Sequence, residues 1–264
     1  MDTLSIPSAS GVDTTALIVG DYSNGNDGII LKKGTSLPEI KGQNVNLVEY
    51  SVSHYLLARG LDSVGLKEAD LTVVNTSDAD MVAASKTDDV TALVTWNPLL
   101  STILEEPGTT EVFSSADIPG EIIDAMMVNS ETLKDNPDFG KALVGAWYET
   151  MALITSGTPE GDAAKTAMAE ASGTDLAGFN AQLATTKLFA KPTDAVAFAE
   201  DPKQKDTAKF VAEFLFDHGI LGTGAPSADF VGVGFPDGSS WGDANNIKLR
   251  FDTTYMQMAA DGAL

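Results

Sequence analysis

Two serines and a histidine stand between a strand-like segment and a helix-like segment early in the chain. Ser51, Ser53 and His54 follow the apolar strand pattern of Asn44 to Val48 and open a run with helical spacing. A helix N-terminus carries unpaired backbone N–H groups and a partial positive charge, so hydroxyls and an imidazole there form a compact polar site. We predict that a polar ligand group docks at this point. Ser51 and Ser53 are both candidate helix caps, and the structural alternative is that Ser53 caps the helix and His54 lies on its first turn.

Polar or aromatic residues also follow the next two predicted strands. Residues 71–74 read as a strand and lead into Asn75 to Asp78, and residues 90–95 lead into Trp96 and Asn97. Strands that alternate with helices in this way predict right-handed βαβ units and a parallel sheet. Ligands of such sheets bind at the carboxyl ends of the strands. We therefore predict Trp96 and Asn97 as ligand contacts, while the indole could equally fill a gap between two domains.

Acidic side chains near two further predicted strands are additional candidates. Asp13 precedes the apolar strand Ala16 to Val19, and Glu121 and Asp124 precede the strand Ala125 to Val128. Paired carboxylates perform acid and base chemistry or bind a cation. Carboxylates in a solvated loop are the ordinary alternative.

The sequence contains no catalytic motif in the structural context that the motif requires. GSSWG, at 238–242, fits G-x-S-x-G with Ser240 as nucleophile, but no predicted strand leads into it and no predicted helix follows it. His54 and His218 are the only histidines, and the chain has no cysteine, which excludes thiol nucleophiles and thiolate metal sites. Phosphate-loop and dinucleotide fingerprints are absent. We predict no catalytic residue, no metal and no cofactor.

Composition restricts the partners of the protein. The 264 residues carry a formal net charge of −22, with a pI of about 4.1, which argues against nucleic acid and anionic membranes as partners. Hydrophobic residues make up 43% of the chain, but no apolar window of about 20 residues occurs. The sequence therefore predicts a globular α/β protein of one or two domains.

The elements that position the candidate residues change in character along the chain. Before Glu131 the chain is strand-rich, with a first pair of strands predicted at Ala16 to Gly20 and Gly28 to Lys32. After it, Ala-rich amphipathic stretches predict helices. These are Phe139 to Thr155, Pro159 to Ser172, Asp175 to Ala184, Thr193 to Glu200 and Pro202 to His218, followed by a strand at Ile247 to Phe251 and a helix at Thr253 to Ala260.

Several segments resemble the solute-binding proteins of ABC importers of the nitrate, sulfonate and thiamine-precursor class. They are GVDTTALIVGD, SLPEIKGQNVNLVEYSVSHYLLARGL, VNTSDADMVAA, VTWNP and MMVNSETLKDNPDFGKAL, and the resemblance covers nearly all of the chain. It is closest to the branch found beside urea carboxylase genes, described as binding urea, short amides or guanidine. The resemblance implies a type II periplasmic-binding-protein fold, with two α/β lobes, a hinge of two crossing strands and a ligand closed between the lobes.

The resemblance also implies a domain plan. Gly28 to Lys33 would be the outward crossing and Ala125 to Asn129 the return. Residues 1–32 would be a remnant of the first lobe, 33–127 the second lobe with a parallel sheet, and 128–264 a helical part that packs on both lobes and completes the first. A family member begins with a signal peptide and further first-lobe elements, which are missing before Met1. We therefore expect a first lobe that is incomplete at its N-terminus and pairs with another copy as a homo-oligomer.

The function implied by the resemblance is that of a periplasmic receptor that passes a small ligand to a membrane permease. The ligand-facing positions of the second lobe would be Ser51, Ser53, His54 and Trp96. Urea, a short amide or guanidinium is the expected ligand, with nitrate, a sulfonate or a thiamine precursor as alternatives. The rival from another class is an enzyme on the same fold, a thiamine-pyrimidine synthase, whose iron site calls for histidine and cysteine ligands that this chain does not supply. A structural or interaction protein is the third reading, and polar groups at three strand ends argue against it.

Overall fold

The computed structural model describes all 264 residues, which form two compact units. The first unit contains Met1–Asp21, Ile123–Leu183 and Leu188–Leu264, and the second contains Tyr22–Ile122 and Ala184–Lys187. The chain thus leaves the first unit after Asp21 and returns to it at Ile123. A second and much shorter excursion follows at 184–187.

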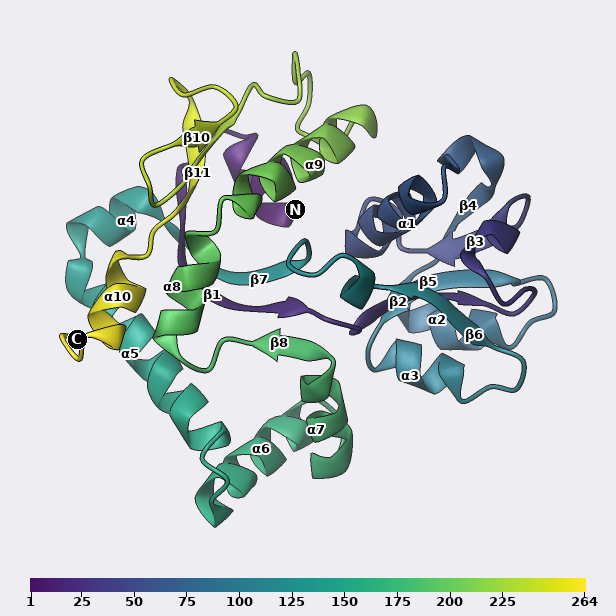
Figure 1. The fold of residues 1–264 in the computed structure, drawn as a ribbon, viewed down its shortest axis with the longest axis horizontal. Helices are drawn as coiled ribbons and strands as arrows, with labels where there is room; N and C mark the ends of the chain where they lie inside the picture. The colour runs from purple at the N-terminus through teal and green to yellow at the C-terminus, as the bar shows by residue number, and fades with distance from the viewer. The chain divides into compact units, whose positions relative to one another are not determined.

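The second unit is built on a five-stranded mixed sheet (Figure 1). Its elements are β2 (Asp27–Leu31), η2 (Leu37–Ile40), β3 (Asn44–Leu47), α1 (Val52–Ser63), η3 (Glu68–Asp70), β4 (Thr72–Asn75), α2 (Asp78–Ser85), β5 (Ala92–Trp96), α3 (Leu99–Leu104), β6 (Thr110–Ser114) and η4 (Ser115–Asp117). The strand order is β4-β3-β5-β2-β6. β3 pairs in parallel with β4 and β5, which confirms the predicted βαβ arrangement, whereas β2 pairs antiparallel with β5 and β6.

Helices cover both faces of this sheet. α1 packs on β2 and β5 from one side, and α2 and α3 lie together on the other (Figure 1). Ile30, Met81, Leu93, Leu100 and Ile103 form the buried core under α2 and α3. The carboxyl ends of β3 and β4 therefore lead directly into α1 and α2, as the sequence predicted.

The first unit combines a second sheet with most of the helices. Its elements are η1 (Leu4–Ser8), β1 (Thr14–Ser23), β7 (Ile123–Asn129), α4 (Ser130–Asp135), α5 (Pro137–Ile154), α6 (Pro159–Ala171), α7 (Leu176–Ala184), β8 (Thr186–Leu188), α8 (Pro192–Ala199), α9 (Lys203–Asp217), β9 (Gly232–Gly234), β10 (Ser240–Trp241), β11 (Ile247–Phe251) and α10 (Thr254–Ala260), where β1 and β8 also extend into the second unit. The strand order is β10-β9-β11-β1-β7, and β8 also pairs with β1. None of the helices has the length and hydropathy needed to cross a membrane.

The predicted outward crossing at Gly28 to Lys33 is wrong. β2 pairs with a strand on each side and all five of its residues are buried, so it is an interior strand of the second unit and not part of a first lobe ending at residue 32. β1 carries the chain out instead, because its ten residues continue past Asp21 to Ser23. An unbroken apolar run is equally typical of a hinge strand and of a buried interior strand, and the sequence pattern could not separate the two.

Two glycines of α5 allow a matched test of the packing of the first unit. A side-chain carbon at Gly140 would lie 2.6 Å from Leu133 and 2.9 Å from the ring of Tyr255, whereas at Gly145 the nearest atom, in Leu264, is 3.9 Å away. We expect Gly140→Ala to lower the free energy of unfolding by about 1–3 kcal/mol through overpacking. Gly145→Ala should raise it by up to about 1 kcal/mol, because alanine is the better helix former. Urea titrations of both variants measure this difference, and equal effects would contradict the packing.

Candidate functional site

α1 begins behind a serine cap at the end of β3. The Ser51 hydroxyl accepts a hydrogen bond from the Ser53 N–H at 3.1 Å and donates one to the Val48 carbonyl at 2.7 Å, so Ser51 is the cap and not Ser53, which the structural alternative had named. Ser53 itself is buried, and its Oγ has no hydrogen-bond partner within the protein. A buried hydroxyl without a partner at the start of a twelve-residue helix is available to a polar ligand group.

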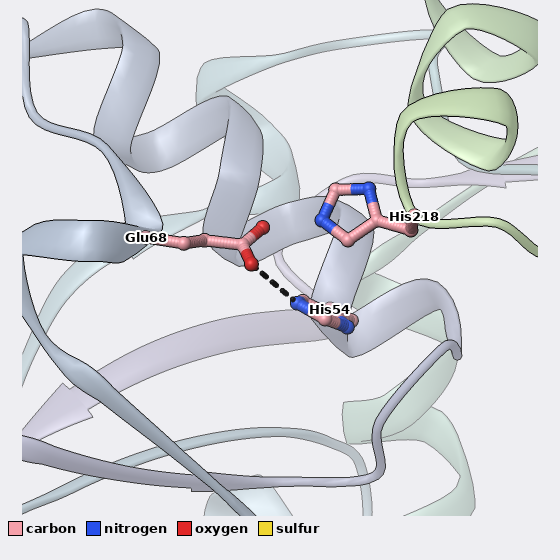
Figure 2. Close-up of side chains that lie close together, drawn as sticks. All are labelled: His54, Glu68 and His218. Atoms are coloured by element: carbon pink, nitrogen blue, oxygen red, sulfur yellow. Dashed lines mark ion pairs between the residues drawn. The ribbon is translucent and has the colours of Figure 1, made fainter.

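His54 is buried and fixes the turn that leads into α1. Its Nδ1 accepts a hydrogen bond from the Tyr50 N–H at 3.1 Å, so a neutral ring carries its proton on Nε2, which lies 3.2 Å from Oε2 of Glu68 (Figure 2). Tyr50 has a φ of 63°, in the left-handed region that side chains disfavour, and its ring is half exposed. The imidazole thus stabilises a strained backbone turn that presents an aromatic ring to solvent. Tyr50 is a candidate contact that the sequence analysis missed, because only the backbone geometry marks it.

Trp96 and Asn97 lie at the end of β5 and differ in how they are used. The Asn97 amide donates to Oγ1 of Thr185 at 3.3 Å, and its oxygen accepts from the Ser101 N–H at 3.1 Å. Asn97 therefore ties the short segment 184–187 to the second unit. Trp96 is half-buried and lies opposite Asp27 of β2 in the sheet. Its side chain, unlike that of Asn97, is not engaged in a hydrogen-bond network.

Asp13 lies in a polar cluster of the first unit at the start of β1. Its carboxylate accepts hydrogen bonds from Nη1 of Arg250 and from the Ser130 hydroxyl, the latter at 2.5 Å. Burial opposes ionisation of this carboxyl, but the two hydrogen bonds and the guanidinium charge hold the pKa of Asp13 below its ordinary value. A cavity of about 630 Å³ adjoins the cluster. Since Arg250 already neutralises Asp13, this carboxylate is poorly placed to bind a cationic ligand.

Glu121 is held by α1 within the second unit. Arg59 donates from Nε to Oε2 at 2.7 Å and from Nη2 to Oε1 at 3.0 Å, and the Tyr55 hydroxyl donates to Oε2 at 2.8 Å. The Arg59 and Glu121 side chains are only 21% and 15% exposed. The Glu121 carboxylate raises the pKa of Arg59, and burial with this carboxylate raises the pKa of Tyr55, so both remain protonated donors. Both oxygens of Glu121 are thus engaged by its own unit.

Two aspartates face each other where the chain leaves and re-enters the first unit. The Ser23 N–H donates to the Ile122 carbonyl at 2.9 Å, and an antiparallel register continued from this pair places Asp21 opposite Asp124. The two carboxyl groups share a hydrogen bond, and burial together with the charge of Asp124 raises the pKa of Asp21 to about 7. Asp21 therefore keeps its proton until the pH approaches about 7.

An indole packs against β1 next to Asp21, but on the face of the strand opposite the carboxyl pair, because successive side chains of a strand point to opposite faces. A side-chain carbon at Gly20, the residue before Asp21, would lie 2.9 Å from the Trp147 ring, so only glycine lets the indole lie against the backbone of β1. The Trp147 Nε1 is buried and has no hydrogen-bond partner. Two adjacent carboxyl groups are acceptors suited to an N–H-rich molecule. The sequence analysis named Asp124 but missed Asp21, because only the strand register brings the two carboxyl groups together.

Comparison with known proteins assigns the family. Residues 38–171 match the model of the NMT1-like family, which is 134 of the 264 residues. The chain belongs to the NMT1-like family. A Brucella abortus protein named as a binding protein is 27% identical over 128 residues, which are 47% of this chain and 40% of that protein. The taurine-binding periplasmic protein of Escherichia coli is 24% identical over 183 residues, 60% of this chain and 56% of that protein. This NMT1-like chain thus spans about half the length of these relatives.

Solved structures confirm the predicted fold. The periplasmic aliphatic sulphonate binding protein SsuA of Escherichia coli matches the NMT1-like chain with a TM-score of 0.68 and 20% identity, over 85% of this chain and 73% of SsuA. The periplasmic nitrate-binding protein NrtA of Synechocystis PCC 6803 matches with a TM-score of 0.51 and 12% identity, over 100% and 80%. The desulfurization enzyme DSZB matches with a TM-score of 0.57 and 15% identity, over 83% and 77%. The chain therefore has the two-lobe α/β fold of periplasmic binding proteins, a fold that an enzyme also uses.

Proposed function

We propose that the protein is the solute-binding component of an ABC importer, which captures a small nitrogen compound in the periplasm and delivers it to a membrane permease. Membership of the NMT1-like family and the fold support the receptor role. The relatives named above bind taurine, sulfonates or nitrate according to their names, which supports a small polar solute. The proposed ligands are guanidinium, urea or a short amide.

The carboxyl pair of Asp21 and Asp124 is the observation that carries this ligand class. Guanidinium would donate N–H groups to both carboxylates in charge-assisted hydrogen bonds, and urea or an amide would donate without the charge. A sulfonate or nitrate would instead meet acceptors of its own charge. The pair therefore favours a cation or a neutral amide over an anion.

A second candidate rests on the N-terminus of α1. The partial positive charge of this helix end and the buried Ser53 hydroxyl are suited to an anion such as nitrate or a sulfonate. This site lies in the second unit, whereas the carboxyl pair lies in the first. The two candidates therefore predict different ligands and different sensitive residues.

A thermal-shift panel with matched variants separates the candidates. Millimolar guanidinium or urea should raise the melting temperature of the parent by mass action. Asp124→Asn should weaken guanidinium binding by about 10- to 100-fold, because it removes a charged acceptor. Asp88→Asn, which changes an exposed aspartate, should leave binding unchanged. A shift with taurine or nitrate alone that Ser53→Ala abolishes would contradict the nitrogen-compound proposal and favour the anion site.

A further inference from the structure

Glu121 stands three residues before Asp124, close to the point where the chain re-enters the first unit. Its carboxylate accepts hydrogen bonds from Tyr55 and Arg59, which lie four residues apart on one face of α1. The three hydrogen bonds to this carboxylate measure 2.7–3.0 Å. The segment just before the return strand β7 is thus fastened, within the second unit, to the helix whose N-terminus carries Ser53.

The backbone connects Glu121 to the carboxyl pair of Asp21 and Asp124. Ile122 follows Glu121 directly, and its carbonyl accepts the hydrogen bond from the Ser23 N–H. This bond sets the register of β7 against β1 at the crossing. A slip of one residue would turn the Asp124 side chain to the opposite face of the sheet, away from Asp21.

We propose that Glu121 is a positioning residue: Arg59 and Tyr55 hold its carboxylate, and Glu121 in turn fixes the register that sets Asp124 opposite Asp21. Glu121 does not contact the ligand, because a ligand that took its oxygens would leave the half-buried Arg59 guanidinium without its partner. The consequence for ligand affinity rests on the proposed function, whereas the consequence for the carboxyl pair does not.

The first test uses the ligand-free protein. Carbon-13 NMR of the aspartate carboxyl groups follows the titration of Asp21, which faces Asp124, while Asp124 also interacts with the Met1 amino group. In Arg59→Met the apparent pKa of Asp21 should fall by at least about one unit, because a shifted Asp124 no longer opposes its ionisation. Tyr55→Phe, which removes one hydrogen bond and keeps the ring, should give a smaller fall.

The control variant, Asp62→Asn, changes a different carboxylate partner of the Arg59 guanidinium. Asp62 lies 3.5 Å from Nη1 of Arg59 and is 69% exposed, so Asp62→Asn should leave the titration of Asp21 unchanged. An unchanged Asp21 titration in folded Arg59→Met and Tyr55→Phe would overturn the positioning role. An equal change in Asp62→Asn would overturn it as well, because the effect would then be one of general charge.

The second test measures affinity. Glu121→Gln should weaken the binding of guanidinium chloride at millimolar concentration by about tenfold, the effect of about 1.4 kcal/mol, while Asp62→Asn binds as the parent does. Unchanged affinity in Glu121→Gln would contradict the inference, and so would lost affinity with an unchanged Asp21 titration, since Glu121 would then be a ligand contact. If the parent binds neither guanidinium nor urea, the proposed function fails, and the carboxyl titration alone decides the positioning role.

Discussion

The Asp21→Asn variant is expected to be more stable than the parent at pH 8 and nearly equal to it at pH 3. The pKa of Asp21 is raised from 3.8 to about 7 in the folded protein, so the unfolded chain loses this proton at lower pH than the folded chain does. Ionisation of Asp21 thus lowers the free energy of unfolding of the parent progressively between about pH 4 and pH 7. Above pH 7 this decrease is complete and stays constant. The asparagine side chain has no titrating proton, so the free energy of unfolding of the variant does not decrease in this way.

The size of this effect is limited by solvent. A rise from 3.8 to about 7 corresponds to at most ~4 kcal/mol, and because water reaches part of the carboxyl pair we expect about 1–2 kcal/mol at pH 8. Urea titrations at pH 8 and pH 3 measure it. Asp88→Asn removes the same charge from an exposed site and should show no pH-dependent gain. A gain of equal size in both variants would mean that net charge, and not the carboxyl pair, is responsible.

The second large effect is expected from the contact between α1 and Glu121. Glu121→Ala leaves a half-buried guanidinium and a phenol without their acceptor, and should lower the free energy of unfolding by about 2–3 kcal/mol. A double-mutant cycle with Arg59→Met and Glu121→Gln should give a coupling energy of about 1–3 kcal/mol. The pair is bidentate and mostly shielded from water, which is why it exceeds a surface ion pair.

The same arginine provides the comparison. Asp62→Asn disrupts its exposed contact at 3.5 Å, and we expect a change within about 0.5 kcal/mol. Chemical denaturation of the parent and the five variants at one pH gives all of these values. A coupling energy near zero for Arg59 and Glu121 would mean that this contact is no stronger than a surface ion pair.

Local signals in the sequence were sufficient for much of the second unit. Serines before an apolar helical run predicted a cap at Ser51 or Ser53, and the alternation of strands and helices predicted the parallel core of β3, β4 and β5. The helices after Glu131 also follow their predicted ranges closely, since amphipathic periodicity is a local property. β9 and β10 were missed. β9 consists of three residues, two of them glycine, and β10 of only two residues, and segments this short show no strand pattern.

The candidate site depended on contacts that no local pattern encodes. Asp21 and Asp124 meet because of a strand register between segments about a hundred residues apart in the chain. Trp147 reaches β1 only because Gly20 leaves room for it. Glu121 was named as a candidate carboxylate, but its partner Arg59 lies 62 residues earlier and the pairing was not visible in the sequence.

Proton counting tests most directly whether a nitrogen-rich ligand binds the carboxyl pair of Asp21 and Asp124. Guanidinium needs both carboxylates ionised, so its binding at pH 6 should release close to one proton, and at pH 9 none. Calorimetric titrations in two buffers of different ionisation enthalpy give this number, and Asp21→Asn should abolish the release. Guanidinium binding at pH 6 without proton release, or binding of taurine or nitrate in place of guanidinium and urea, would contradict the account.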